Sequence, residues 1–243
     1  MSKEKNKSKV LAVVIPAYNE EKHIGEVVKS VPRTIAHKGK TLKTAVVVVD
    51  DCSKDATAKV AKANGAAVAR HIINTGAGGA TRTGLHYAMD AIDNLEYVVT
   101  IDADGQHSVE DIEKVVDYAI DNKSQMIVGS RLHEGNNESM PLHRRYGNIG
   151  LSLISRALFG IKTKDTQSGL RLFKADILPM VSDYTIDRYG FCTEMLWLAA
   201  KHNINVEEVP ISVKYSEETL NNGQNNWGVI HLVLDLLWIR ISR

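Results

Sequence analysis

Five short runs rich in apolar residues, each followed by polar residues, predict the strands of a buried parallel sheet. They cover residues 10–15, 44–49, 66–71, 97–101 and 125–129. Nearly continuous apolar runs of this length are typical of parallel strands that helices cover on both faces. The polar residues after each strand are therefore expected along one rim of the sheet, where ligands bind in open α/β folds.

The segments between these runs have helical character. Helices are expected over residues 21–35, 56–63 and 109–120, with Pro32 ending or kinking the first and Ser108 capping the last. A further helix is expected to start within residues 74–84 and to end at Asp90. Three β–α units before residue 102 predict a nucleotide-binding half-sheet. The remaining elements are expected over residues 141–159 (helix), 172–174 (strand), 195–202 (helix) and 206–214 (an edge strand, because it contains Pro210).

The strand at residues 97–101 runs into Asp102-Ala103-Asp104-Gly105-Gln106-His107. In an extended backbone, residues i and i+2 project to the same side, so Asp102 and Asp104 can aim at one point beyond the strand. Two carboxylates there suit Mg²⁺ or Mn²⁺, with the other coordination positions left to water and substrate phosphates. For an isolated Asp-x-Asp, the alternative is a solvated turn that closes the strand.

A glycine-rich stretch, residues 74–84, has two interpretations. Its backbone N–H groups could cradle a phosphate at the start of the following helix. It is neither a P-loop nor a dinucleotide fingerprint, because Thr81 stands where that pattern has its last glycine and no Gly-Lys-Ser/Thr is present. The second interpretation is a tight turn with close helix packing.

The composition fits one α/β domain, or one domain with a small appendage. The chain has 243 residues, of which 44% are hydrophobic and 24% are charged. The net charge of +1 gives no electrostatic reason to expect a nucleic-acid partner, and no nucleic acid is expected. Cys52 and Cys192 lack metal-type spacing, which favours a reducing, cytoplasmic setting.

The two ends of the chain bear on whether the protein is expected to associate with a membrane. No apolar segment follows the lysines near the N-terminus, so no signal peptide is predicted, and no apolar run reaches the roughly 18 residues that span a bilayer. Residues 227–241 are apolar except for three polar positions and carry Trp227 and Trp238 near their ends. They predict a helix that lies at a membrane interface or packs against the domain's own core.

Seven pieces of the sequence, spread in order over nearly the whole chain, resemble the family 2 glycosyltransferases, specifically the dolichyl- or polyprenyl-phosphate sugar synthases. They are VIPAYNE (14–20), VVDDCSKD (48–55), NTGAG (74–78), DADGQH (102–107), GSR (129–131), DTQSGLR (165–171) and EVPI (208–211). The resemblance implies a GT-A fold, a mixed, mainly parallel sheet flanked by helices, over residues 1–226, with residues 227–243 as an appended amphipathic helix. It implies transfer, with inversion, of a sugar from a nucleotide-diphosphate sugar to a polyprenyl (dolichyl) phosphate at the cytoplasmic face of a membrane.

Carried over position by position, the resemblance implies a nucleotide-sugar site. The nucleoside pocket would be lined by Pro16, Ala17, Tyr18, Glu20, Val49 and Asp51. The ribose and diphosphate would be held by Asp102, Ala103 and Asp104, and a Mg²⁺ or Mn²⁺ ion by Asp102, Asp104 and Gln106. Arg131 would meet phosphate charge. Gly105, after the second aspartate, favours a UDP-sugar over a GDP-sugar.

The acceptor phosphate would be received by Arg144, with Asn148 nearby, since the planar guanidinium suits phosphate. A phosphate monoester is already anionic at neutral pH, so a general base is less necessary than for a sugar hydroxyl. Asp104, Arg131 and Asp165 are the candidate catalytic residues.

Asp165 would be the base if one is used, or would orient Arg171 or the acceptor. Glu194 is a second candidate base.

The sequence also departs from the pattern of the family. Ala77 stands where many relatives have a lysine, and the late arginine and lysine of a closing loop are not evident after residue 211. Relatives often continue into transmembrane helices, so the chain is either a short form held at the surface by its last helix or a piece cut at Arg243. Two other functions stay open: transfer to a sugar hydroxyl of a glycan or protein, and a non-catalytic nucleotide-sugar binding module.

Overall fold

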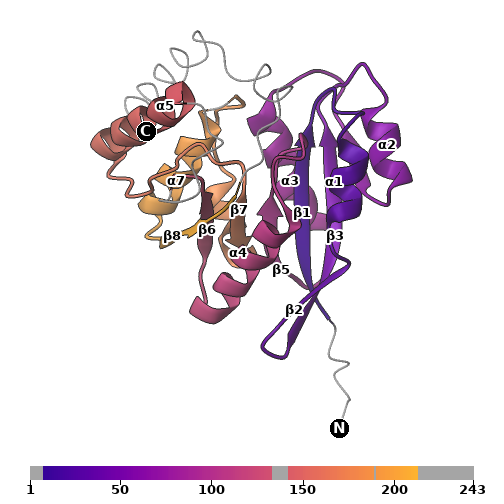
Figure 1. Ribbon diagram of the computed structural model, residues 1–243, viewed down its shortest axis with the longest axis horizontal. Helices are drawn as coiled ribbons and strands as arrows, with labels where there is room; N and C mark the ends of the chain where they lie inside the picture. The colour runs from indigo at the N-terminus through magenta and orange to yellow at the C-terminus, as the bar shows by residue number, and fades with distance from the viewer. Residues whose placement is uncertain (1–7, 133–141, 189, 213–243) are drawn as a thin grey trace.

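In the computed structural model, which describes residues 8–132, 142–188 and 190–212, eight strands form one mixed sheet (Figure 1). Their order is β2-β3-β1-β5-β7-β6-β8, and β4 pairs with β3. The β2–β3, β5–β7 and β6–β7 pairs are antiparallel and the others are parallel, which confirms the expected mixed, mainly parallel α/β sheet. The strands are β1 (Lys9–Ala17), β2 (Thr34–His37), β3 (Lys40–Asp50), β4 (Ala67–Arg70), β5 (Leu95–Thr100), β6 (Met126–Ser130), β7 (Arg171–Lys174) and β8 (Val206–Pro210).

Helices cover both faces of this sheet. On β1, Leu11, Val13 and Ile15 pack with α1, α2 and α4, whereas Ala12 and Val14 pack with α3, α6 and α7. Because both sides of the strand are buried, its sequence is apolar after Lys9. Each buried Leu, Ile or Val contributes roughly 1.5–3 kcal/mol. The helices are α1 (Ile24–Ser30), α2 (Thr57–Ala63), α3 (Ala77–Ala91), α4 (Val109–Asn122), α5 (Leu142–Phe159), α6 (Leu178–Val181), preceded by a 3₁₀ turn (Ala175–Ile177), and α7 (Phe191–Lys201).

The expected helix over residues 21–35 is wrong in its second half. Helix α1 ends at Ser30, and Pro32 cannot continue it because proline has no N–H to donate. The chain then forms β2, which pairs antiparallel with β3 through a turn at Lys38-Gly39, where φ is 46° and 79°. A two-residue turn that ends in glycine, between segments of alternating polarity, is the hairpin signal that the helical interpretation overlooked.

Strand β7 enters the sheet between β5 and β6 and is antiparallel to both. Its first residue, Arg171, pairs with Thr100 at the end of β5. The segment that precedes β7, residues 165–170, therefore lies beside the end of β5, where the Asp102–Asp104 segment begins. The strand itself was expected, but its place inside the sheet was not.

Other expected elements are present in the structure, but their ends are shifted. Ser108 caps α4 through a hydrogen bond from the Asp111 N–H, and the helix expected over residues 195–202 begins earlier, at Phe191. Strand β8 pairs only with β6 among the described strands, as expected of an edge strand, and it ends at Pro210.

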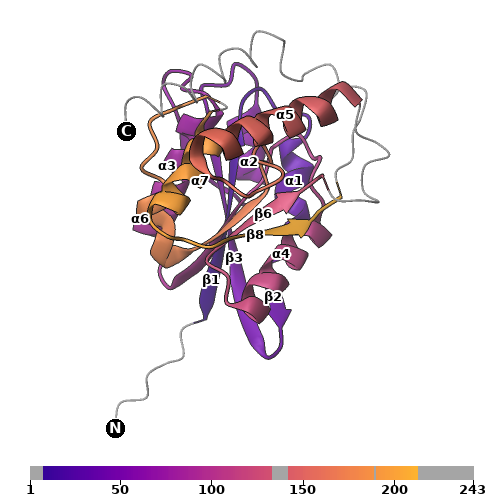
Figure 2. The same ribbon diagram turned by 90° about the vertical axis from the view of Figure 1, so that its left-hand side faces the viewer.

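Helix α5 lies at the end of the molecule to which the parallel strands point, and crosses above β6 and α7 (Figure 2). It confirms the helix expected over residues 141–159. The helix expected at residues 227–243 falls outside the described residues. Within the described part, none of the helices combines the length and apolarity that crossing a bilayer requires.

Candidate active site

The polar segments after β1, β3, β5 and β6 meet at one rim of the sheet, uppermost in Figure 1. Asn19 N–H donates to Ser53 Oγ at 2.9 Å, and Asp51 N–H donates to the Ala17 carbonyl at 2.9 Å, so the first two segments are tied together. Arg131 after β6 binds Asp165, next to the segment that reaches Asp102. The expected rim of strand ends is thus confirmed.

The protein shifts the pKa values of Asp102 and Asp104 in opposite directions. Burial would raise the pKa of Asp102, but a hydrogen bond from His107 Nε2 to Oδ2 at 3.2 Å and the charges of His107, Arg131 and Arg171 lower it overall. Burial and then the negative charge of Asp102 raise the pKa of Asp104 to about 6. One acid is therefore held ionised by the protein, and it makes ionisation of the other harder.

The turn after β5 fixes both acids. Gln106 N–H donates to Asp104 Oδ1 at 3.0 Å, and Gly105 has φ of 75°, which favours glycine. Asp102 lies so close to Gly169 that a Cβ on residue 169 would overlap its carboxylate. Thr100 Oγ1 donates to the Gly169 carbonyl at 2.8 Å, which keeps that segment in place.

The residues at this turn fit a divalent cation. Two hard carboxylates follow one strand, and the raised pKa of Asp104 reports a repulsion that a bound cation would relieve. Among the described residues no group of three or more His, Cys, Asp or Glu side chains is placed to hold a metal alone. Mg²⁺ or Mn²⁺ held here would keep positions for water and phosphate oxygens, as those ions prefer.

Arg131 and Asp165 form a buried, two-pronged ion pair. Arg131 Nε donates to Asp165 Oδ2 at 2.8 Å, Nη2 donates to Oδ1 at 2.8 Å, and the Arg131 N–H adds a third bond at 3.0 Å. Burial would raise the pKa of Asp165, but the charge and hydrogen bonds of Arg131 lower it overall. Asp165 therefore fixes the guanidinium of Arg131 against the rim.

Asp165 does not pair with Arg171, which was one of its expected roles. Arg171 is fully buried and donates to the carbonyls of Thr166, Ser168 and Cys192, so it holds the segment before β7 by its backbone. Glu208 of β8, which sequence reasoning missed, accepts the N–H groups of Lys164 and Asp165. Glu208 opens the EVPI piece, but no local pattern indicates this role, because its partners are distant in sequence.

The carboxylate of Glu194 is also engaged in hydrogen bonds within the protein. Its carboxylate is buried and accepts hydrogen bonds from Thr185 N–H and Oγ1 and from Ile186 N–H. It therefore fixes the segment over residues 184–187.

That segment in turn contacts the glycine-rich stretch. The N–H groups of Gly78 and Gly79 donate to the Asp187 carbonyl at 2.7 and 3.2 Å, and Tyr184 Oη donates to the Gly78 carbonyl. A Cβ at Gly78 would overlap the backbone of residues 186–187. Close helix packing, the second interpretation of residues 74–84, is thus confirmed, and these two N–H groups are not available to a phosphate.

Asp51 is surrounded by donors from the loop after β4. It accepts hydrogen bonds from Thr75 N–H and Oγ1 at 2.9 Å, from Gly76 N–H at 2.7 Å and from His71 Nδ1 at 2.8 Å. Burial would raise its pKa, but these bonds lower it overall. Its carboxylate thus organises the loop on one side of the expected nucleoside pocket.

The other expected nucleoside-pocket residues differ in exposure. Ala17, Val49 and Ala103 are buried, with Val49 packed under α3 near Gly84, while Tyr18 is 45% exposed. Pro16 is the second-last residue of strand β1, and Glu20 pairs with His23 Nδ1 at 3.1 Å. A nucleoside bound here would meet the exposed ring of Tyr18 and the strand-end backbone.

The two expected acceptor residues lie on α5. Arg144 and Asn148 are one helical turn apart along its first half, at the same end of the molecule as the strand ends. Their side chains fall outside the described part of the structure, so their expected contact with an acceptor phosphate stays a prediction.

Comparison with known proteins gives a consistent family match. The family model described as "Glycosyl transferase family 2" matches residues 12–179. An uncharacterized protein of Methanocaldococcus jannaschii is 40% identical over 90% of this chain and 87% of its own length. The UDP-N-acetylglucosamine–dolichyl-phosphate N-acetylglucosaminyltransferase of Methanococcus voltae is 37% identical over 97% of this chain and 98% of its own.

Among solved structures, the fold is similar to that of glucosyl-3-phosphoglycerate synthase from Mycobacterium tuberculosis in complex with UDP. The TM-score is 0.68 over 96% of this chain and 80% of that one. The sequence identity of 19% limits this likeness to the fold.

Proposed function

Since the chain belongs to glycosyl transferase family 2, we propose that it transfers a sugar from a nucleotide-diphosphate sugar to a polyprenyl (dolichyl) phosphate, with inversion at the sugar carbon. The proposal includes dependence on Mg²⁺ or Mn²⁺, a preference for UDP over GDP, and action at the cytoplasmic face of a membrane. The name of the Methanococcus voltae relative supports this class of donor and acceptor.

The observation that carries the proposal is the pair of acids after β5. Asp102 is held ionised, and Asp104 has a pKa of about 6, so both carry charge at neutral pH although they repel each other. A divalent cation bound by this pair would neutralise charge on the departing nucleotide diphosphate. Asp102, Asp104 and the adjoining Ala103 would hold the donor at the strand end, and Gln106 would complete the site.

Arg131 would stabilise the same diphosphate. Its charge contributes to the lowered pKa of Asp102, so it acts on the region where the diphosphate would lie. Asp165 keeps its guanidinium in one orientation through two parallel hydrogen bonds. A donor group fixed before the reaction needs no rearrangement when charge develops on the leaving group.

The state of the remaining acids supports a phosphate acceptor over a hydroxyl acceptor. A hydroxyl would need a general base, yet Asp165 has a lowered pKa and is engaged by Arg131, and Glu194 is engaged by residues 185–186. A phosphate monoester is already an anionic nucleophile and needs no such base. We therefore assign Asp165 the role of positioning Arg131, and assign Arg144 and Asn148 to the acceptor.

The test is a transfer assay with radiolabelled sugars. A panel of UDP- and GDP-sugars is combined with a short-chain polyprenyl phosphate, with Mn²⁺, Mg²⁺ or a chelator. Metal-dependent label in the organic phase is the expected result, and the active donor identifies the base and the sugar. Donor consumption with label only on soluble glycan or protein would replace the lipid acceptor by a hydroxyl, and donor binding without consumption would indicate a binding module.

A further inference from the structure

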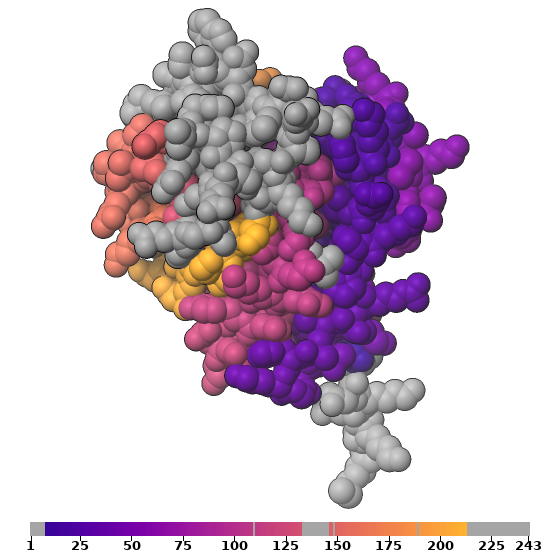
Figure 3. Space-filling model, viewed as in Figure 1, coloured from indigo at the N-terminus to yellow at the C-terminus, as the bar shows by residue number. Residues whose placement is uncertain are grey.

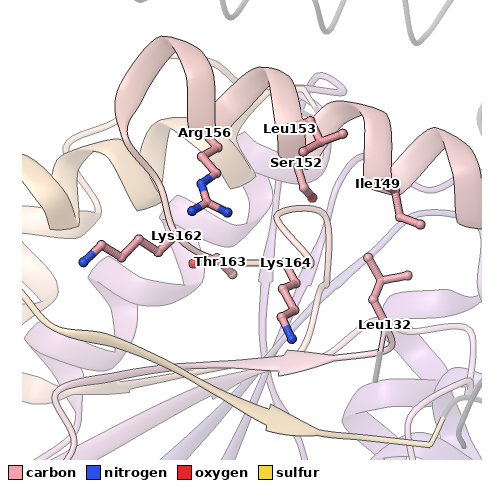
Figure 4. Close-up of a pocket in the computed structure, with 8 residues that line it drawn as sticks. All are labelled: Leu132, Ile149, Ser152, Leu153, Arg156, Lys162, Thr163 and Lys164. Carbon is pink, nitrogen blue, oxygen red and sulfur yellow. The ribbon is translucent and has the colours of Figure 1, made fainter. Parts of the chain in front are cut away.

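A pocket beside the candidate active site combines three cationic side chains with apolar walls. It lies between α5 and the extended segment over residues 160–164 and has a volume of about 230 Å³ (Figure 4). This is below the roughly 300–1,000 Å³ of a pocket that encloses a drug-sized ligand, so the pocket fits a small head group and the start of a chain.

The cations come from two elements. Arg156 of α5 points down into the space above the segment that carries Lys162 and Lys164, and Thr163 between these lysines is buried (Figure 4). None of the three cationic side chains makes a hydrogen bond or ion pair with another described residue, and the described residues that line the pocket include no acid. Three cationic side chains at one pocket attract an anion, and phosphate is a common biological anion with several negative charges.

The other walls are apolar. Leu132 points up towards Ile149, and Leu153 of α5 stays 60% exposed beside them (Figure 4). An exposed leucine over a cationic pocket suits a ligand with an apolar chain next to its charge. A free inorganic anion would make no use of these three side chains.

The pocket and the candidate active site share a wall. Leu132 follows Arg131 directly, and Lys164 precedes Asp165, so the ion pair of the site adjoins the lining of the pocket. Ser152, which lines the pocket, bonds to Thr166 in the segment that leads to Gly169 and Asp102. A ligand in the pocket therefore lies directly behind the residues that would act on the donor.

We propose that this pocket is a holding site for the lipid phosphate acceptor, with the phosphate bound by Arg156, Lys162 and Lys164 and the first isoprenoid units along Leu132, Ile149 and Leu153. The inference rests on the proposed function, because it takes the acceptor to be a polyprenyl phosphate. It adds a non-catalytic site that raises the local concentration of acceptor beside Arg131. The reaction itself then takes place on the other side of the shared wall.

The test compares two triple variants of the full chain. The first is Arg156→Gln, Lys162→Gln and Lys164→Gln. The control is Lys29→Gln, Lys59→Gln and Lys62→Gln, which removes the same charge from exposed positions on α1 and α2. These two helices lie on the opposite flank of the molecule from α5 (Figure 1 and Figure 3). Binding of a short-chain polyprenyl phosphate, of the matching polyprenol, of inorganic phosphate and of anionic phospholipid vesicles is measured by equilibrium methods, together with the transfer kinetics.

The expected result is a loss of polyprenyl phosphate affinity and a rise in acceptor KM of at least about tenfold in the pocket variant alone. The donor KM and kcat stay within about twofold of the unmodified chain. The direct binding measurement keeps this inference separate from the proposed function, since it needs no turnover. If the unmodified chain binds the lipid phosphate through the pocket but transfers no sugar, only the proposed function fails.

Three outcomes would overturn the proposal. Equal affinity and acceptor KM in both variants would remove the pocket from acceptor binding. Inorganic phosphate bound as tightly as the lipid phosphate would deny the apolar walls any role. A loss confined to vesicle binding would make the site one for membrane phospholipid head groups.

Discussion

At the end of β3 the chain carries Asp50 and Asp51, and at the end of β5 it carries Asp102 and Asp104. The first pair is engaged by the protein itself: Asp50 accepts the Ser53 N–H at 3.0 Å and forms an ion pair with Arg70, and Asp51 accepts four hydrogen bonds. In the second pair, Asp104 has a pKa raised to about 6 by burial and by its neighbour.

The difference separates acids that build the fold from acids that we propose bind a cation. Both pairs follow a buried apolar strand, so sequence pattern alone treats them alike. Donors from residues 71–76 lower the pKa of Asp51, whereas the Gln106 N–H and the charge of His107 do not offset the burial of Asp104 and its repulsion by Asp102. Removing an acid from each pair should therefore change stability in opposite directions.

The largest expected effect is the loss of activity in Asp104→Ala. Metal-dependent turnover should fall by at least about 10²-fold, the size typical of removing one electrostatic stabiliser of a transition state. Thermal unfolding should occur at an unchanged or higher temperature, because a repulsion is removed. The measurements are sugar transfer and differential scanning calorimetry.

The matched control is Asp90→Ala, which removes an exposed acid from α3 and should leave turnover unchanged. Preserved turnover in Asp104→Ala would contradict the metal assignment. A drop in its thermal stability would contradict the contrast between the two acid pairs.

Asp51→Asn should instead destabilise the fold. The variant loses the charge that four donors solvate, and hydrogen bonds to a charged group contribute about 1.5–3 kcal/mol each, so a loss of about 2–4 kcal/mol in unfolding free energy is expected. Chemical denaturation at pH 7 measures it. An unchanged midpoint would mean that the loop over residues 71–76 is held by other contacts.

The pH dependence of that loss sharpens the prediction. Because the folded pKa of Asp51 lies below the ordinary value of 3.8, its stabilisation is fully present above that value and disappears as the pH falls through the folded pKa. The stability difference between the unmodified chain and Asp51→Asn should therefore shrink in acid. A difference that stays constant down to the acid range would show that its origin is geometric.

The smallest expected effect comes from changing Gly169, which packs against Asp102. Gly169→Ala places a methyl group against the Asp102 carboxylate, and overpacking of this kind costs about 1–3 kcal/mol. Sugar transfer should fall by about tenfold while donor consumption stays metal-dependent. Gly150→Ala, at a helical position with open space around it, is the control and should change neither sugar transfer nor stability.

The parts of the fold that sequence could predict are those specified locally. The apolar runs placed β1, β3, β5 and β6, and the spacing of Asp102 and Asp104 placed both acids after one strand. The pairing of Arg131 with Asp165 joins residues 34 positions apart, and it follows from the insertion of β7 rather than from any local pattern. Asp165 was therefore expected to be a base or a partner of Arg171.

The hairpin of β2 and the contact of Glu208 with residues 164–165 were missed for different reasons. The hairpin has a local signal in Lys38-Gly39, but helical propensity in the preceding residues outweighed it. Glu208 has none, because its role depends on β8 pairing with β6. Tertiary pairing, and not residue type, decided which acids became structural.

The position of β7 also determines the order in which the molecule can assemble during synthesis. Strands β1, β3, β4 and β5 are complete once Thr100 has been made, but β5 receives its second neighbour only after Arg171–Lys174 has emerged. Until then the nascent chain carries β5 with one edge unpaired, which is a template for pairing with other chains. The same delay leaves Asp102 without the Gly169 segment that packs against its carboxylate until β7 has been made.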